Sequence, residues 1–102
     1  MKSKVYDIVL HSPMGPKKGT LTLVQEEGGY SADIFLMKNL NHFKAASVRA
    51  NEFLLTGALR TLIGEVACTV NVKIKDGILS AVADTAKGIM KVDGRLAESN
   101  SE

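Results

Sequence analysis

The sequence predicts an all-β fold, an eight-stranded antiparallel up-and-down meander that forms a closed or nearly closed barrel. Two observations lead to this prediction. Turn-forming residues recur at a nearly constant spacing along the chain, and apolar residues alternate with other residues between those turns. A fixed spacing with turn residues at two phases is typical of a repeated hairpin.

The first set of turns has a hydroxyl residue three positions before a glycine. It occurs as SPMG at Ser12–Gly15, TLIG at Thr61–Gly64 and TAKG at Thr85–Gly88. A second set of turns lies between the members of the first, at Gly28-Gly29, Asn51-Glu52 and Asp76-Gly77. Gly-Gly and Asp-Gly suit two-residue hairpin loops because these residues accept positive φ.

Together with the polar break MKNLNH at residues 37–42, the turns divide the chain into eight predicted strands. These strands run at roughly 4–11, 18–26, 30–37, 42–50, 53–60, 65–75, 78–85 and 88–96. The clearest is 65–75, because every second residue in it is apolar, which is the pattern of a strand with one buried face. That face carries Val66, Cys68, Val70, Val72 and Ile74.

The other strands differ in how clearly they define an inner face. In strand 53–60 we expect Leu55, Gly57 and Leu59 to point inward. In strand 78–85 the pattern leaves two alternatives, since apolar residues occupy both faces. One face carries Leu79, Ala81 and Ala83, and the other carries Ile78 and Val82.

Two other folds are to be weighed against the barrel. The segment KAASVRANEFLLTGALRTLIGEV, residues 44–66, is rich in alanine and leucine and could form a helix. Gly57, two threonines and the turn expected near Asn51 argue against that helix. The sheet could also stay open and cover its apolar face by dimerising, whereas closure would remove both exposed edges.

Length and composition limit the classes of protein. The 102 residues suit a single domain, which we place at 1–97, followed by a disordered tail at 98–102. The chain has 13 basic and 11 acidic residues, a balance that predicts neither a nucleic-acid partner nor a membrane surface. One cysteine excludes an internal disulfide, and no signal peptide is recognisable. We therefore expect a soluble, cytoplasmic protein.

The turn motifs carry a resemblance to a known kind of domain. The chain resembles a small bacterial β-barrel domain that has repeated T-P-M-G turns followed by G-x-V-D-G hairpins. SPMG, TLIG and TAKG match the turns, and KDGILS at Lys75–Ser80 matches the hairpin. The resemblance implies a barrel but no activity. In outline the architecture is also similar to avidins and lipocalins, although a chain without tryptophan lacks the aromatic walls of a biotin site and the Gly-x-Trp opening of a lipocalin.

Few residues are candidates for chemistry. His11 and His42 are the only histidines, and no cluster of histidine, cysteine and carboxylates has the spacing of a metal site. Cys68 lies on the apolar face of its strand, where a cysteine behaves as a small hydrophobic residue. The sequence therefore predicts no catalytic residue, no metal site and no cofactor.

Two non-catalytic functions remain. The favoured one is an interaction or oligomerisation module, a homodimer that associates through outward apolar residues. This predicted patch consists of Leu54, Ala58, Ala67 and Ile78. The alternative is a binder of a small apolar ligand in the barrel interior, where small inward residues leave space. The residues expected to line that space are Ala32, Ala46, Gly57, Cys68, Ala81 and Gly94.

Overall fold

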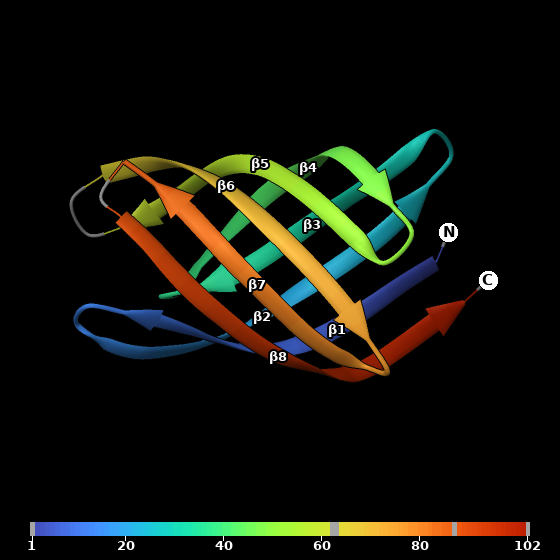
Figure 1. Ribbon diagram of the computed structural model, residues 1–102, viewed down its shortest axis with the longest axis horizontal. Coiled ribbons are helices and arrows are strands. Elements are labelled where there is room, and N and C mark those ends of the chain that lie inside the picture. The colour runs from blue at the N-terminus through green and yellow to red at the C-terminus, as the bar shows by residue number, and fades with distance from the viewer. Residues whose placement is uncertain (1, 62–63, 87, 102) are drawn as a thin grey trace.

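The computed structural model describes residues 2–61, 64–86 and 88–101 and shows a closed antiparallel barrel (Figure 1). Each strand pairs with the next one, and the last pairs with the first. The strands are β1 (Lys2–Ser12), β2 (Gly15–Glu26), β3 (Gly29–Leu36), β4 (Asn39–Arg49), β5 (Glu52–Thr61), β6 (Gly64–Lys75), β7 (Ile78–Thr85) and β8 (Gly88–Ser101). The predicted meander is confirmed, and the described residues of the segment 44–66 form strands and a turn rather than a helix.

The termini and the turns divide between the two ends of the barrel. Both termini lie at one end, together with the β2–β3, β4–β5 and β6–β7 turns (Figure 1). The remaining turns lie at the other end, and the molecule is 38 Å long and 23 Å by 22 Å across. The two sets of turns recognised in the sequence therefore belong to opposite ends of the barrel.

The repeated hydroxyl-glycine motif has a structural reason. The Ser12 hydroxyl donates a hydrogen bond to the carbonyl oxygen of Gly15 over 2.6 Å, and the Thr85 hydroxyl does the same to Gly88 over 2.8 Å. Both glycines have positive φ, +108° and +125°, which a residue with a Cβ rarely adopts. The motif at Thr61–Gly64 includes residues 62 and 63, which lie outside the described residues.

The second set of turns is confirmed at one position and shifted by one residue at two. Asp76 and Gly77 form a two-residue loop with φ of +53° and +77°, as a turn of the I′ type requires. The other loops are Glu27-Gly28 and Ala50-Asn51 rather than Gly28-Gly29 and Asn51-Glu52. The reason is the register, because Gly29 pairs with Glu26 and Glu52 pairs with Arg49, which leaves both outside the loops.

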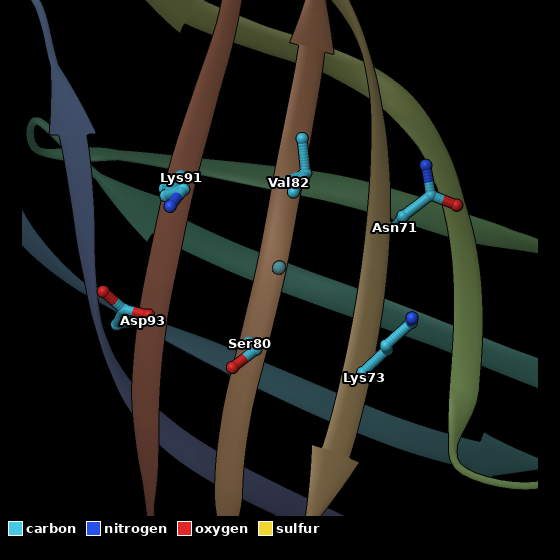
Figure 2. Close-up of a pocket in the computed structure, with 7 residues that line it drawn as sticks. Asn71, Lys73, Ser80, Val82, Lys91 and Asp93 are labelled. Atoms are coloured by element: carbon cyan, nitrogen blue, oxygen red, sulfur yellow. The ribbon is translucent and has the colours of Figure 1, made fainter.

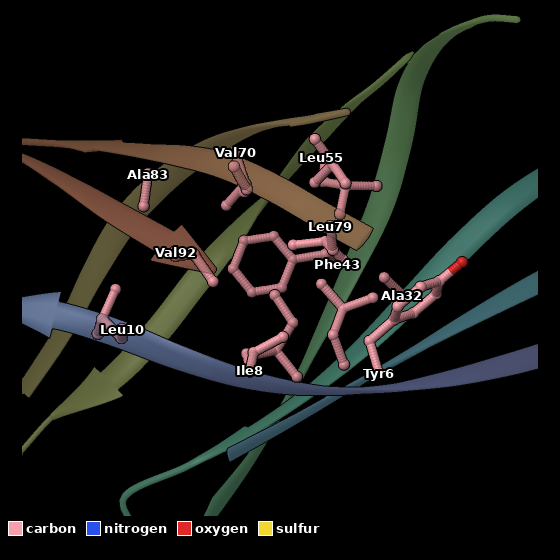
Figure 3. Close-up of a cluster of buried hydrophobic side chains, with 14 of the residues drawn as sticks. Tyr6, Ile8, Leu10, Ala32, Phe43, Leu55, Val70, Leu79, Ala83 and Val92 are labelled. Carbon is pink, nitrogen blue, oxygen red and sulfur yellow. The ribbon is translucent and has the colours of Figure 1, made fainter. Parts of the chain in front are cut away.

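Apolar side chains from all eight strands fill the interior (Figure 3). Two rings are among the most deeply buried side chains, since Tyr6 is 1% exposed and Phe43 is fully buried. The undecided strand β7 directs Leu79, Ala81 and Ala83 inward and leaves Ile78 and Val82 exposed. The inward positions predicted for 53–60 and 65–75 are also confirmed for Leu55 and Leu59 on β5 and for Cys68, Val70 and Val72 on β6.

Two β-bulges correct the prediction near the end with the termini. In the β4–β5 pair the register shifts between Ala45 and Ser47, so Ala46 is the extra residue. Ala46 is exposed, and its predicted inward position is wrong because a bulge residue stands outside the two-residue alternation.

The second bulge lies at Ala97. Tyr6 pairs with Leu96 and Val5 pairs with Glu98, so Ala97 has no direct partner on β1. Beyond it β8 continues in register with β1, and Ser101 pairs with Lys2. The disordered tail expected from residue 98 is instead part of a strand up to Ser101, because β1 offers backbone partners that the alternation pattern could not reveal.

Candidate functional site

The end of the barrel that holds the termini contains a cavity of about 390 Å³, which we call the terminal mouth. This volume is within the range of about 300–1,000 Å³ that is common for small-molecule sites. Its lining residues come from six strands and the β4–β5 turn. They are Lys2, Lys4, Tyr6, Leu23, Gln25, Tyr30, Ala50, Asn51, Phe53, Ile74 and Ser99.

One side of the terminal mouth is aromatic and apolar. The rings of Tyr30 on β3 and Phe53 on β5 meet edge to face, with centroids 5.1 Å apart and an interplanar angle of 67°. Ile74 on β6 is half-buried beside the core. Phe53 lies two residues before Leu55 on the inner face of β5, so the alternation of the strand carries the apolar interior up to the cavity.

The other side of the terminal mouth is polar. Lys2 and Lys4 share the inner face of β1 with Tyr6, because the three residues occupy every second position of the strand. Lys4 pairs with Ser99 on β8, and Lys2 pairs with Gln25 on β2. Neither lysine forms an ion pair with a residue that the structure describes.

Tyr6 links the core to this polar side. Its ring is buried, and burial raises the pKa of its phenol above the usual 10.0. The hydroxyl points away from the other labelled core side chains (Figure 3), and it has no hydrogen-bond partner within the described ranges. No buried side-chain oxygen of a described residue lacks a hydrogen-bond partner, so the Tyr6 hydroxyl reaches the open space of the terminal mouth, where it is a free donor.

The residues expected to line a ligand lie elsewhere. Ala32, Cys68 and Ala81 are buried in the filled core, and none of the six expected residues lines the terminal mouth. An added Cβ on Gly57 would lie 2.8 Å from the Phe43 ring, and one on Gly94 would lie 2.8 Å from Ile8. The small residues therefore make room for larger neighbouring side chains.

The outer face of β6, β7 and β8 carries a second, shallower hollow of about 620 Å³ (Figure 2). Val82 lies in it between Lys91 on β8 and Asn71 on β6. Its lining residues are Asn71, Lys73, Ser80, Ala81, Val82, Lys91 and Asp93. Lys73 also pairs with Glu52 across β5 and β6, with 3.4 Å between Nζ and Oε1.

The predicted self-association patch is divided by this hollow. Ala58 and Ala67 pair directly across β5 and β6, and Leu54 pairs with Asn71. Ile78 is 47% exposed but lies on the far side of the Lys73–Ser80 pair. Ala58 and Ala67 are thus neighbours, whereas the Thr56–Thr69 pair separates Leu54 from them and polar side chains separate Ile78 from Leu54.

Both histidines are paired with aspartates on the outer surface. His11 Nε2 lies 3.0 Å from Asp93, and His42 Nδ1 lies 2.7 Å from Asp33. Over residues 2–61, 64–86 and 88–101, no three side chains of histidine, cysteine, aspartate or glutamate gather as a metal site would require. Cys68 is buried, and burial, with a smaller contribution from Asp84, raises the pKa of its thiol to about 11.

Comparison with known proteins identifies no relative from which a function could be inferred for this site. No family model, no curated protein and no solved structure matches the chain. In the described part of the chain no helix has the length and apolar character needed to cross a bilayer.

The sequence contained a signal for the terminal mouth that the search for small residues missed. Tyr30 precedes Ala32 by two positions, and Phe53 precedes Leu55 by two. Extending the inward alternation of each strand to its end would have placed both rings and Lys4 on the inner face. The gathering of these residues around one cavity depends on barrel closure, which pairs β8 with β1.

Proposed function

We propose that this protein is a non-catalytic binding module that takes a small, largely apolar molecule at the terminal mouth. The observation that carries the proposal is the cavity itself, in which the Tyr30 and Phe53 rings continue the core to the surface. Mouths of β-barrels are frequent sites for small ligands, and such sites combine apolar walls with a few polar groups. The proposal moves the ligand from the barrel interior, which Phe43 and Tyr6 fill, to its open end.

The neutral dye N-phenyl-1-naphthylamine tests the proposal. The chain has no tryptophan, and its two tyrosines, Tyr6 and Tyr30, both line the terminal mouth. Binding there should raise the dye emission and quench the tyrosine emission in the same titration. Gln25→Trp should abolish dye binding because the indole would occupy the cavity, whereas Lys18→Trp on the outer face of β2 should not. Dye binding that is unaffected by Gln25→Trp, or no binding at all, would contradict the proposal.

Self-association remains the second candidate function. It is favoured by the hollow on β6–β8, which contains the exposed Val82 together with Lys91 and Asp93, because a two-fold axis could pair each cation with an anion of the other copy. Leu54, Ala58 and Ala67 adjoin this face. A stable dimer would bury about 800 Å² on each copy.

We further propose that the chain belongs among the small bacterial barrels with repeated T-P-M-G turns, a kinship supported by its turn motifs alone.

Sedimentation velocity at micromolar concentration tests the dimer. Wild type should sediment as a dimer, and Leu54→Glu should sediment as a folded monomer because like charges would meet near the axis. Lys18→Gln on β2, outside the predicted patch, changes the net charge by the same one unit and should remain dimeric. A monomeric wild type would refute the dimer.

A further inference from the structure

The terminal mouth is chemically asymmetric. The strands β3, β5 and β6 contribute the apolar residues Tyr30, Phe53 and Ile74. The strands β1, β2 and β8 contribute Lys4 and its neighbours Lys2, Gln25 and Ser99. A ligand that is apolar throughout would cover the aromatic side but would leave the polar side without a partner.

The groups on the polar side are all able to donate hydrogen bonds, and the two strongest are positively charged. Lys2 and Lys4 have no anionic partner within the described part of the chain. The Tyr6 hydroxyl is an unpartnered donor on a side chain that is 1% exposed, and it is separated from Lys4 by two positions on the same face of β1. A phenol donor and an ammonium group that line the same cavity suit an anionic oxygen acceptor.

From this asymmetry we infer that the ligand is a small amphipathic anion, an apolar ring or short chain that carries one acidic group. Its apolar part lies against Tyr30 and Phe53, and its acidic group accepts hydrogen bonds from Tyr6 and Lys4. Lys2 adds a second positive charge at the rim of the cavity. This inference rests on the proposed binding function and adds to it the charge and the orientation of the ligand.

Two dyes with the same ring system separate the inference from the proposal on which it rests. N-phenyl-1-naphthylamine is neutral, and 8-anilino-1-naphthalenesulfonate adds one sulfonate to the same skeleton. The sulfonate dye should bind more tightly, and added salt should weaken its binding but leave that of the neutral dye unchanged. Equal affinity of both dyes, with no effect of salt, would overturn the inference and leave the proposed function standing. Binding of neither dye would overturn both.

Single substitutions locate the acidic group. Lys4→Gln should weaken binding of the sulfonate dye by about two- to fivefold, the range for one exposed ion pair. Tyr6→Phe should weaken it by about two- to tenfold, the range for one hydrogen bond. Each change should weaken the sulfonate dye more than the neutral dye, because the aromatic side of the cavity is intact and only the sulfonate needs the lost group.

Lys18→Gln is the matched control, since it removes the same charge from the outer face of β2. It should leave both affinities as in wild type. The inference is overturned if Lys18→Gln weakens the sulfonate dye as much as Lys4→Gln does, because the effect would then come from the overall charge. It is also overturned if Tyr6→Phe affects both dyes equally. Thermal unfolding of each variant serves to check that the barrel remains folded.

Discussion

The ring of Phe43 covers Gly57 on the neighbouring strand. A Cβ added to Gly57 would lie 2.8 and 2.9 Å from two ring carbons of Phe43 and 3.1 Å from the carbonyl oxygen of His42. Real Cβ atoms essentially never approach other atoms to less than 3.0 Å. Gly57 is therefore required by the close approach of an aromatic ring across the sheet, which is a known way to stabilise a glycine in a strand.

The first prediction concerns this contact. Gly57→Ala should destabilise the barrel by about 1–3 kcal/mol, because the fully buried Phe43 ring has no free space into which to move. Urea unfolding followed by circular dichroism measures the loss. In the double variant with Phe43→Leu the smaller side chain should tolerate the new methyl group, so the two effects should be non-additive. Strictly additive losses would mean that the ring and the glycine are not coupled.

The second prediction concerns the repeated turn motif. Ser12→Ala and Thr85→Ala each remove one hydrogen bond to a turn carbonyl, at 2.6 and 2.8 Å. Each should lower the free energy of unfolding by about 1 kcal/mol. Ser80→Ala is the control, because Ser80 is exposed and forms no hydrogen bond to a described residue, and it should be neutral. A control that costs as much as the two motif variants would show that the motif has no special role.

The third prediction tests the inner face of β6. Val70 is 4% exposed and pairs with Leu55 and Ala83, both buried. Val70→Asp should cost several kcal/mol and leave the chain largely unfolded, because an unpaired carboxylate would be placed in the core. The adjacent change Asn71→Asp puts the same charge on the outer face and should be tolerated. Similar melting temperatures for the two variants would contradict the register of β6.

The fourth prediction concerns the thiol of Cys68. Burial first, and then the negative charge of Asp84, raises its pKa to about 11. A thiol alkylates as its thiolate, so the folded protein should resist iodoacetamide at pH 8 and react only in denaturant. Rapid alkylation of the folded barrel would show that Cys68 is accessible.

The same raised pKa predicts how stability depends on pH. The thiol of the unfolded chain ionises near its usual pKa of 9.0, whereas the folded protein keeps the proton until about pH 11. The unfolded state therefore binds fewer protons in that window, and the contribution of Cys68 to stability falls as the pH rises through it. Comparison with Cys68→Ala isolates this contribution from the tyrosines and lysines that titrate nearby. Parallel stability curves for the two proteins above pH 9 would refute the raised pKa.

Short-range patterns in the sequence were enough to identify the strands and most of their inner faces. The alternation in β6 predicted the burial of Cys68, Val70 and Val72 because successive side chains of a strand point to opposite sides. The hydroxyl-glycine motif located one set of turns because the glycine needs positive φ and the hydroxyl bonds within four residues. Such interactions are local, so they leave a trace in the order of neighbouring residues.

Only the tertiary structure decided the features that depend on residues far apart in the chain. The bulges at Ala46 and Ala97 arise where one strand of a pair has an extra residue that the partner strand does not match. The inner face of β7 is set by its pairing with β6, where Val70 pairs with Ala83 and Val72 pairs with Ala81. The terminal mouth brings Tyr6, Tyr30 and Phe53 together from three strands. Barrel closure joins the first strand to the last through backbone hydrogen bonds. Because these bonds do not depend on which side chains the strands carry, the sequence alone does not specify which residues meet at the mouth.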